Sequence, residues 1–137
     1  EQDLKMGMGV LSENSRRLCT HVVGENSRVK EGMSLLQRHD GIGFGKLLQR
    51  SHESLRDNFE VSCPEIDWLV KRSSELPGCY GSKLVGPGFG SCTLGLFSQD
   101  SLDEYRKRLD EYEHIFGFSP NLHNIEPSGG ARIIFSK

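Results

Sequence analysis

The glycine-rich stretch at residues 81–93 holds the residue types with the clearest chemical potential in this sequence. Its apolar flanks, which end at Val85 and resume at Cys92, predict a strand on each side of a loop. Gly86, Gly88 and Gly90 recur at alternate positions, which lets the backbone take positive φ values or approach another group closely. The N–H groups of such a loop can bind an anion, above all phosphate.

The spacing of these glycines keeps a second interpretation open. Gly-x-Gly-x-Gly is not the dinucleotide fingerprint, and it is not a nucleotide P-loop because no Gly-Lys-Ser/Thr follows. An ordinary hairpin loop between two strands would carry the same residue types. The pattern alone therefore leaves both a phosphate-binding loop and a structural turn open.

Residues for proton transfer or nucleophilic attack do not form a recognisable set. An enzyme site needs a positioned base, a nucleophile or a metal. Ser62, Ser91 and Cys92 have no identifiable base partner in the sequence. Cys92 also opens an apolar strand, where a packed thiol is expected. A glycine loop binds or shapes a site, so we predict no catalytic residue in this chain.

Metal-binding patterns are also missing from the sequence. The four cysteines are widely spaced, without Cys-x-x-Cys and without a His pair at zinc spacing. His52 and Glu53 do not extend to a zinc-protease helix motif, because Arg56 stands where the second His is needed. We therefore predict no metal site and expect free thiols in a reducing cytosol. The cysteines are Cys19, Cys63, Cys79 and Cys92.

Composition argues against two classes of partner. The 137 residues hold 17 Lys and Arg against 19 Asp and Glu, a net charge of -2, with no basic stripe for nucleic acid. No apolar run approaches the roughly 20 residues that span a bilayer, and no signal peptide is visible. The chain begins at Glu1 instead of Met, which suggests a fragment of a longer cytoplasmic protein.

Helical periodicity predicts two helices in the first half of the chain, over residues 14–39 and about 47–59. The glycines at 41–45 are interpreted as a turn into the second helix and not as a phosphate loop, because no Ser or Thr follows Lys46. The first helix is expected to have a single apolar face. That face consists of Leu18, Val22, Val29, Met33 and Leu36.

Two capping-box pairs, Ser62 with Glu65 and Ser101 with Glu104, predict the start of a helix on each side of the glycine loop. Apolar residues at intervals of three and four continue both patterns. The helices are predicted over residues 64–76 and 102–116.

The last part of the sequence predicts short strands at residues 122–126 and 131–135, separated by a Pro-Ser-Gly-Gly turn. Helices and strands do not alternate regularly along the chain. This order favours an antiparallel α+β sheet with helices packed on one face. There is no long linker or internal repeat, so we predict a single domain over residues 1–137.

Four segments together resemble the galactokinases, which belong to the GHMP small-molecule kinase superfamily. Residues 21–29 are similar to a galactokinase helix, and residues 51–67 resemble a galactokinase stretch nearly residue for residue. Residues 81–92, Gly-Ser-Lys-Leu-Val-Gly-Pro-Gly-Phe-Gly-Ser-Cys, resemble the third motif of these kinases. Residues 126–131 resemble the galactokinase C-terminus, so the match covers about residues 14–133.

The resemblance implies a galactokinase C-terminal domain, with a ferredoxin-like antiparallel sheet preceded by a helical hairpin. In that family the γ-phosphoryl of MgATP is transferred to the C1 hydroxyl of galactose. The resemblance implies that the N-terminal half of the protein holds the sugar site, the ATP phosphate loop, the magnesium ligands and the catalytic carboxylate. That half is therefore the expected partner of this chain, and without it the chain would be inactive. The resemblance places the glycine loop beside the active site, without a role in proton transfer. Its residues are Gly86, Pro87, Gly88, Phe89, Gly90 and Ser91.

Three positions of the loop depart from the family pattern. Val85 stands where Thr is usual, Pro87 where a small residue or glycine is usual, and Ser91 where glycine is usual. Pro87 removes an N–H donor and fixes φ near about -65°. These departures leave two alternatives open: a non-catalytic galactokinase-like sugar sensor or regulatory binding module, and a kinase for a related amino sugar such as N-acetylgalactosamine.

Overall fold

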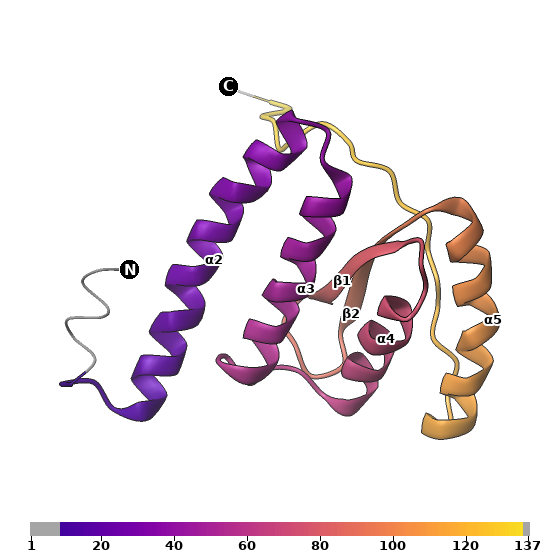
Figure 1. The fold of residues 1–137 in the computed structure, drawn as a ribbon, viewed down its shortest axis with the longest axis horizontal. Coiled ribbons are helices and arrows are strands. Elements are labelled where there is room, and N and C mark those ends of the chain that lie inside the picture. Colours follow the sequence, from indigo (N-terminus) through magenta and orange to yellow (C-terminus); the bar gives the residue numbers. More distant parts are fainter. Residues whose placement is uncertain (1–8, 136–137) are drawn as a thin grey trace.

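The structure, a computed structural model, describes residues 9–135. Within them, three α-helices, a two-stranded sheet and a further helix follow one another along the chain, as the sequence predicts (Figure 1). The elements are α2 (Glu13–Gln37), α3 (Gly41–Asp57), α4 (Pro64–Ser74), β1 (Cys79–Val85), β2 (Cys92–Phe97) and α5 (Gln99–Phe116).

The sheet is an antiparallel hairpin whose two strands are joined by the glycine loop. β1 pairs with β2 from Cys79 opposite Phe97 to Val85 opposite Cys92. Helices α3 and α4 both pack against β1, and α5 packs against α4. Helices α2 and α3, which precede the sheet in the chain, lie side by side (Figure 1). The predicted antiparallel α+β architecture, preceded by a helical hairpin, is confirmed.

The core is apolar and lies mainly between α4, the sheet and α5. The face of α4 that its periodicity predicts is buried, with Ile66 and Val70 only 3% and 2% exposed. Burying each such side chain contributes about 1.5–3 kcal/mol to stability. The buried hydrophobic residues are Leu35, Leu47, Ile66, Val70, Leu76, Leu84, Tyr105 and Tyr112.

Helix α3 approaches β1 so closely that each backbone needs a glycine at the contact. A Cβ on Gly45 would lie 2.0 Å from the carbonyl oxygen of Tyr80. A Cβ on Gly81 would lie 1.8 Å from the carbonyl oxygen of Gly45. The glycines at 41–45 are therefore structural, as predicted, but they lie inside α3, which begins at Gly41. The turn precedes them, and the Asp40 side chain caps the helix by accepting from the Gly43 N–H at 2.7 Å.

The single apolar face predicted for the first helix is present on α2, and it is largely exposed. Four of its five residues are 51% to 62% exposed. Helix α2 instead packs on α3 through the adjacent face that holds Gly32 and Leu35, where a Cβ on Gly32 would lie 3.3 Å from the Phe44 ring. No helix within residues 9–135 is long and apolar enough to cross a membrane. The exposed residues, named here the α2 stripe, are Val22, Val29, Met33 and Leu36.

Both predicted capping boxes are wrong. The N-cap of α4 is Cys63, which makes no side-chain cap bond, and Ser62 donates its hydroxyl to Asp67 instead. Helix α5 begins at Gln99, so Ser101 lies inside it and accepts a hydrogen bond from Ser98 Oγ at 3.1 Å. Each of these two serine hydroxyls is hydrogen-bonded to another side chain, and this bond competes with its use as a helix cap.

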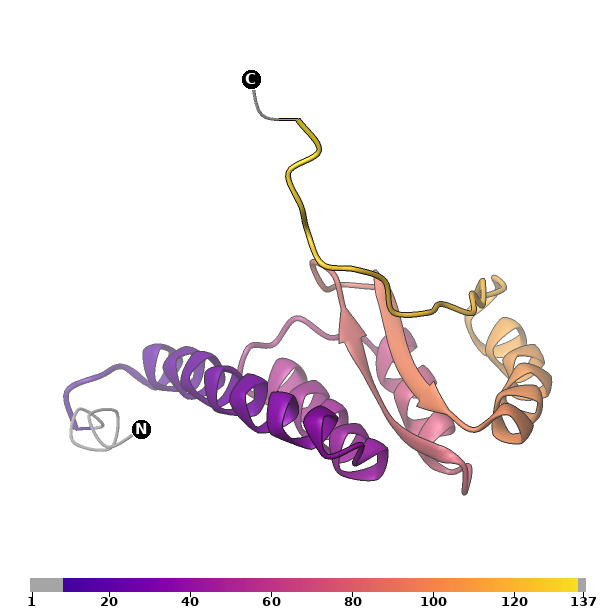
Figure 2. The ribbon, with the colours of Figure 1, turned by 90° about the horizontal axis from the view of Figure 1, so that it is seen from above.

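The strands predicted at residues 122–126 and 131–135 do not form. After Gly117, which ends α5 in the left-handed conformation with φ 81°, the described chain has no strand. Figure 2 shows this segment as an extended trace that passes the sheet and then leaves the body of the molecule. A strand requires a partner edge, and these residues pair with none within residues 9–135. Their apolar side chains are exposed as a result: Ile125, Ile133, Ile134 and Phe135.

Candidate functional site

The glycine loop between β1 and β2 has an unusual backbone. Gly86, Gly88 and Gly90 have φ values of 89°, 94° and 92°, in the region that favours glycine. Phe89 between them has a φ of 51°, which costs an L-residue about 1–2 kcal/mol. The predicted use of glycine for positive φ is confirmed at all three positions.

Ser91 closes the neck of the loop. Its hydroxyl donates to the carbonyl oxygen of Val85 at 2.8 Å, beside the last strand pair, Val85 with Cys92. A Cβ on Gly86 would lie 3.2 Å from Ser91 Cβ and Oγ, so the two residues are in close contact. The Ser91 hydroxyl is therefore a structural tie and is not paired with a base.

The loop rests on Val61, in the segment between α3 and α4. The Phe89 N–H donates to the Val61 carbonyl oxygen at 2.9 Å. Gly88 is buried against the same residue, where an added Cβ would lie 2.7 Å from the Val61 oxygen. The Phe89 side chain then points into solvent and is 74% exposed. No sequence pattern pointed to Val61, because a contact with a main-chain carbonyl does not depend on residue type.

A charged network joins β1 to the helical hairpin. Lys83 Nζ donates to Ser51 Oγ at 2.6 Å, and Ser51 Oγ donates to Glu25 Oε2 at 2.8 Å. Arg28 Nε donates to the other Glu25 oxygen at 2.6 Å. Burial opposes the Glu25 charge, but the hydrogen bonds from Arg28 and Ser51 and the charge of Lys83 outweigh it, so the pKa of Glu25 is lowered. The network fixes β1 relative to both α2 and α3.

His52 on α3 lies between β1 and α4 and is 1% exposed. Its Nδ1 accepts from the Leu84 N–H at 3.3 Å. Its Nε2 faces Asp67 Oδ1 at 3.3 Å, close enough for attraction but without hydrogen-bond alignment. Burial lowers the pKa of His52 although the Asp67 charge acts in the opposite direction.

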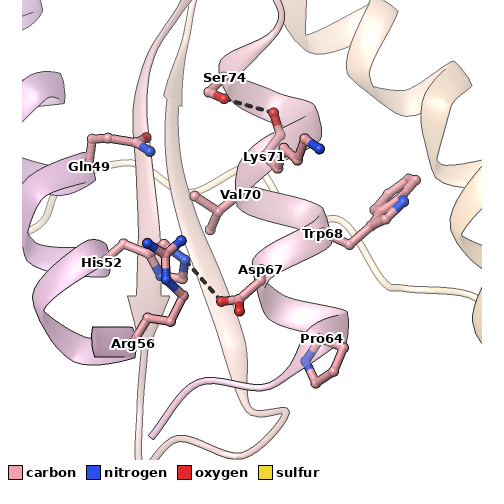
Figure 3. Close-up of a pocket in the computed structure, with 9 residues that line it drawn as sticks. All are labelled: Gln49, His52, Arg56, Pro64, Asp67, Trp68, Val70, Lys71 and Ser74. Atoms are coloured by element: carbon pink, nitrogen blue, oxygen red, sulfur yellow. Dashed lines mark hydrogen bonds and ion pairs between the residues drawn. The ribbon is translucent and has the colours of Figure 1, made fainter. Parts of the chain in front are cut away.

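A shallow cavity of about 390 Å³ separates α3 from α4 beside this histidine (Figure 3). In Figure 3, His52 and Asp67 point toward each other, whereas Trp68 points away from them. The Trp68 ring packs instead at 5.5 Å from the Tyr112 ring of α5. Trp68 still belongs to the lining of the cavity, together with His52.

The three candidate nucleophiles considered from the sequence have different surroundings in the structure. Ser62 donates to Asp67 Oδ1 at 2.6 Å, and Ser91 donates to a backbone carbonyl. Cys92 is exposed at the start of β2, which corrects the expectation of a packed thiol; a strand end has less cover than a strand centre. All four cysteines are free thiols, as predicted. Within residues 9–135, no group of three or more His, Cys, Asp and Glu side chains could hold a metal ion.

Comparison with known proteins assigns the chain to a family. The family model of GHMP kinases C terminal matches residues 33–114, which is more than half of the chain. The galactokinase of Roseiflexus sp. (strain RS-1) is 42% identical over 131 residues, 95% of this chain and 34% of that protein. The galactokinase of Homo sapiens is 35% identical over 133 residues, 97% of this chain and 33% of that protein.

Solved structures agree with this assignment. Lactococcus lactis galactokinase, crystallised with galactose, matches with a TM-score of 0.80 and 29% identity over 86% of this chain and 31% of that chain. L. major mevalonate kinase, solved with R-mevalonate, shares the fold with a TM-score of 0.63 over 80% of this chain and 32% of that chain, at 24% identity. The chain spans about a third of the length of the curated relatives it matches. It belongs to the family of GHMP kinase C-terminal domains.

Proposed function

We propose that this chain is the C-terminal domain of a cytoplasmic galactokinase, which in its full-length form transfers the γ-phosphoryl of ATP to the C1 hydroxyl of galactose. The observation that carries the proposal is the similarity to galactokinases over 95% of the chain. The described residues hold no group of three or more His, Cys, Asp and Glu side chains that could hold a metal, and Mg²⁺ would be bound mostly outside this chain. The sugar site and the catalytic carboxylate belong there too, and the chain alone is inactive.

The glycine loop, Gly86 to Ser91, supports the active site from this domain. Its geometry favours a supporting wall over a phosphate cradle. Pro87 has no N–H, and the Phe89 N–H is bonded to Val61, so two of the six loop residues offer no donor to a phosphate. Backbone strain at a non-glycine residue such as Phe89 is typical of functional segments. Phosphoryl transfer depends on positioning and electrostatics, to which a rigid wall contributes.

Turnover by the full-length protein tests this function. With ATP and galactose we expect ADP and galactose 1-phosphate to form at equal rates, and no product from the 137-residue chain alone. N-acetylgalactosamine is the matched competing substrate. Binding of galactose and MgATP without any turnover would contradict the kinase and favour the sugar sensor, and faster turnover of the amino sugar would favour the related kinase.

The departures at three loop positions motivate the sensor alternative and can be tested in the same assay. The triple change Val85→Thr, Pro87→Gly and Ser91→Gly restores the family pattern. If the loop had lost catalytic competence, this variant would turn over where the natural loop does not. In an active enzyme we expect no gain, because the Ser91 tie to Val85 already closes the neck at 2.8 Å.

The α2 stripe is the surface that we expect the preceding part of the protein to cover. It consists of Val22, Val29, Met33 and Leu36, and the relatives are about three times as long as this chain. A contiguous exposed apolar surface of this kind is typical of an interface.

Lysine substitutions in the full-length protein test whether another part of the protein covers the α2 stripe. Val29→Lys and Met33→Lys are each expected to lower its Tm, because each removes about 1.5–3 kcal/mol of side-chain burial. Ser34→Lys adds the same charge at an exposed position of the same helix and serves as the control. Equal Tm values for all three variants and the natural protein would show that α2 faces solvent.

A further inference from the structure

We propose that His52 is a positioning residue which, with Asp67 and Ser62, braces the strand that enters the glycine loop and the segment on which the loop rests. This inference rests on the proposed function, because the position of the loop affects turnover only if the loop lies at the active site. His52 lies in α3, away from the loop in sequence, and no feature of the loop itself points to it.

The first arm of the brace reaches the strand that enters the loop. His52 Nδ1 accepts the N–H of Leu84, two residues before Gly86. Both side chains are 1% exposed, so no water competes for this donor. A ring that accepts at Nδ1 carries its proton on Nε2. Burial lowers the pKa of His52 and thereby keeps this neutral form.

The second arm reaches the segment on which the loop rests. The protonated Nε2 faces Asp67 Oδ1 at 3.3 Å, and Ser62 Oγ donates to the same oxygen at 2.6 Å. Ser62 directly follows Val61, whose carbonyl oxygen accepts the Phe89 N–H at 2.9 Å.

The two arms close a circuit. It runs from Leu84 through His52 and Asp67 to the Ser62 segment, and through the Val61 carbonyl back to Phe89 inside the loop. Figure 3 shows the link at its centre, where His52 of α3 and Asp67 of α4 point toward each other. A leucine of similar size could fill the space but could neither accept from Leu84 nor attract Asp67. A histidine does both, which accounts for a buried imidazole at this position.

Three variants of the full-length protein distinguish the contributions of the two arms. His52→Asn keeps an acceptor at the Nδ1 position, and His52→Leu removes both arms. Asp67→Ala removes the second arm alone. The readouts are kcat, the KM for galactose, and hydrogen exchange of the Leu84 and Phe89 amides. Leu76→Ala, a buried residue that takes no part in the circuit, controls for loss of stability.

We expect His52→Leu to lower kcat by about 10- to 100-fold, the effect of displacing a site by roughly 1 Å. The KM for galactose should change less than about twofold, since the sugar is bound elsewhere. Exchange should be at least about tenfold faster at Leu84 and Phe89 in His52→Leu, and at Phe89 alone in Asp67→Ala. His52→Asn should restore most of kcat and the slow exchange of Leu84. Leu76→Ala should lower Tm and leave kcat within about threefold.

Two results would overturn the brace: loop amides in His52→Leu that exchange at the natural rate, or His52→Asn as impaired as His52→Leu. The exchange readout needs no turnover. If the natural full-length protein has no kinase activity, the proposed function fails, and exchange at Leu84 and Phe89 still decides whether His52 braces the loop.

Discussion

Replacing Gly88 by alanine in the full-length protein is expected to lower kcat by about 100-fold, the effect of misplacing an active-site element by roughly 1 Å. Gly88 has a φ of 94°, and an added Cβ would lie 2.7 Å from the Val61 oxygen and 2.8 Å from Val61 Cβ. These two atoms are the carbonyl oxygen and the Cβ of a residue in the segment between α3 and α4, so neither is the far end of a flexible side chain. The loop must therefore lift off Val61 and break the Phe89 hydrogen bond.

Gly90→Ala is the matched control for this prediction. Gly90 has nearly the same φ, 92°, but an added Cβ would meet only Cys63 Sγ at 4.0 Å. The change Gly90→Ala therefore imposes the backbone strain of about 1–2 kcal/mol without a collision of the new Cβ with Val61. We expect it to lower kcat by about tenfold or less, with little change in the KM for galactose. Equal losses in the two variants would show that φ alone matters and that contact with Val61 does not.

The sequence predicted the glycine loop well because its requirements are local. Positive φ at Gly86, Gly88 and Gly90 follows from residue type, and the hairpin follows from the flanking apolar residues. The partners of the loop could not be predicted in this way. Val61 contributes a carbonyl that every residue has, and His52 accepts from a backbone N–H. Such contacts depend on the packing of α3 and α4 and not on spacing in the sequence.

Periodicity also located helix α2 without saying what covers it. The apolar stripe was correctly placed on one face, but Gly32 and Leu35 on the adjacent face make the buried contact. A helix can approach its neighbour closely at a small residue, and the periodicity of large apolar residues does not predict such a contact. The strands predicted at 122–126 and 131–135 failed for a related reason. Their residue types favour strands, but strand formation depends on pairing with an edge, and these residues pair with neither strand of the described sheet.

The largest effect on stability is expected from Gly45→Ala, which places a methyl group 2.0 Å from the Tyr80 carbonyl oxygen. Helix propensity alone would make this change stabilising by about 1 kcal/mol. Because both sides of the contact are backbone, α3 must move away from β1, and overpacking of this kind costs about 1–3 kcal/mol or more. We expect a net loss, seen in thermal unfolding of the full-length protein as a Tm lower by roughly 1–3 °C.

Gly41→Ala is the control, because it makes the same change in the same helix, where no atom lies within 4 Å of the new methyl group. It should leave Tm unchanged or raise it. Gly81→Ala, with its Cβ 1.8 Å from the Gly45 oxygen, should resemble Gly45→Ala. The double variant should lose less than the sum of the two, because one displacement of α3 makes room for both methyl groups. A fully additive loss would mean that the two glycines serve separate contacts, and a rise in Tm for Gly45→Ala would refute the close approach of α3 to β1.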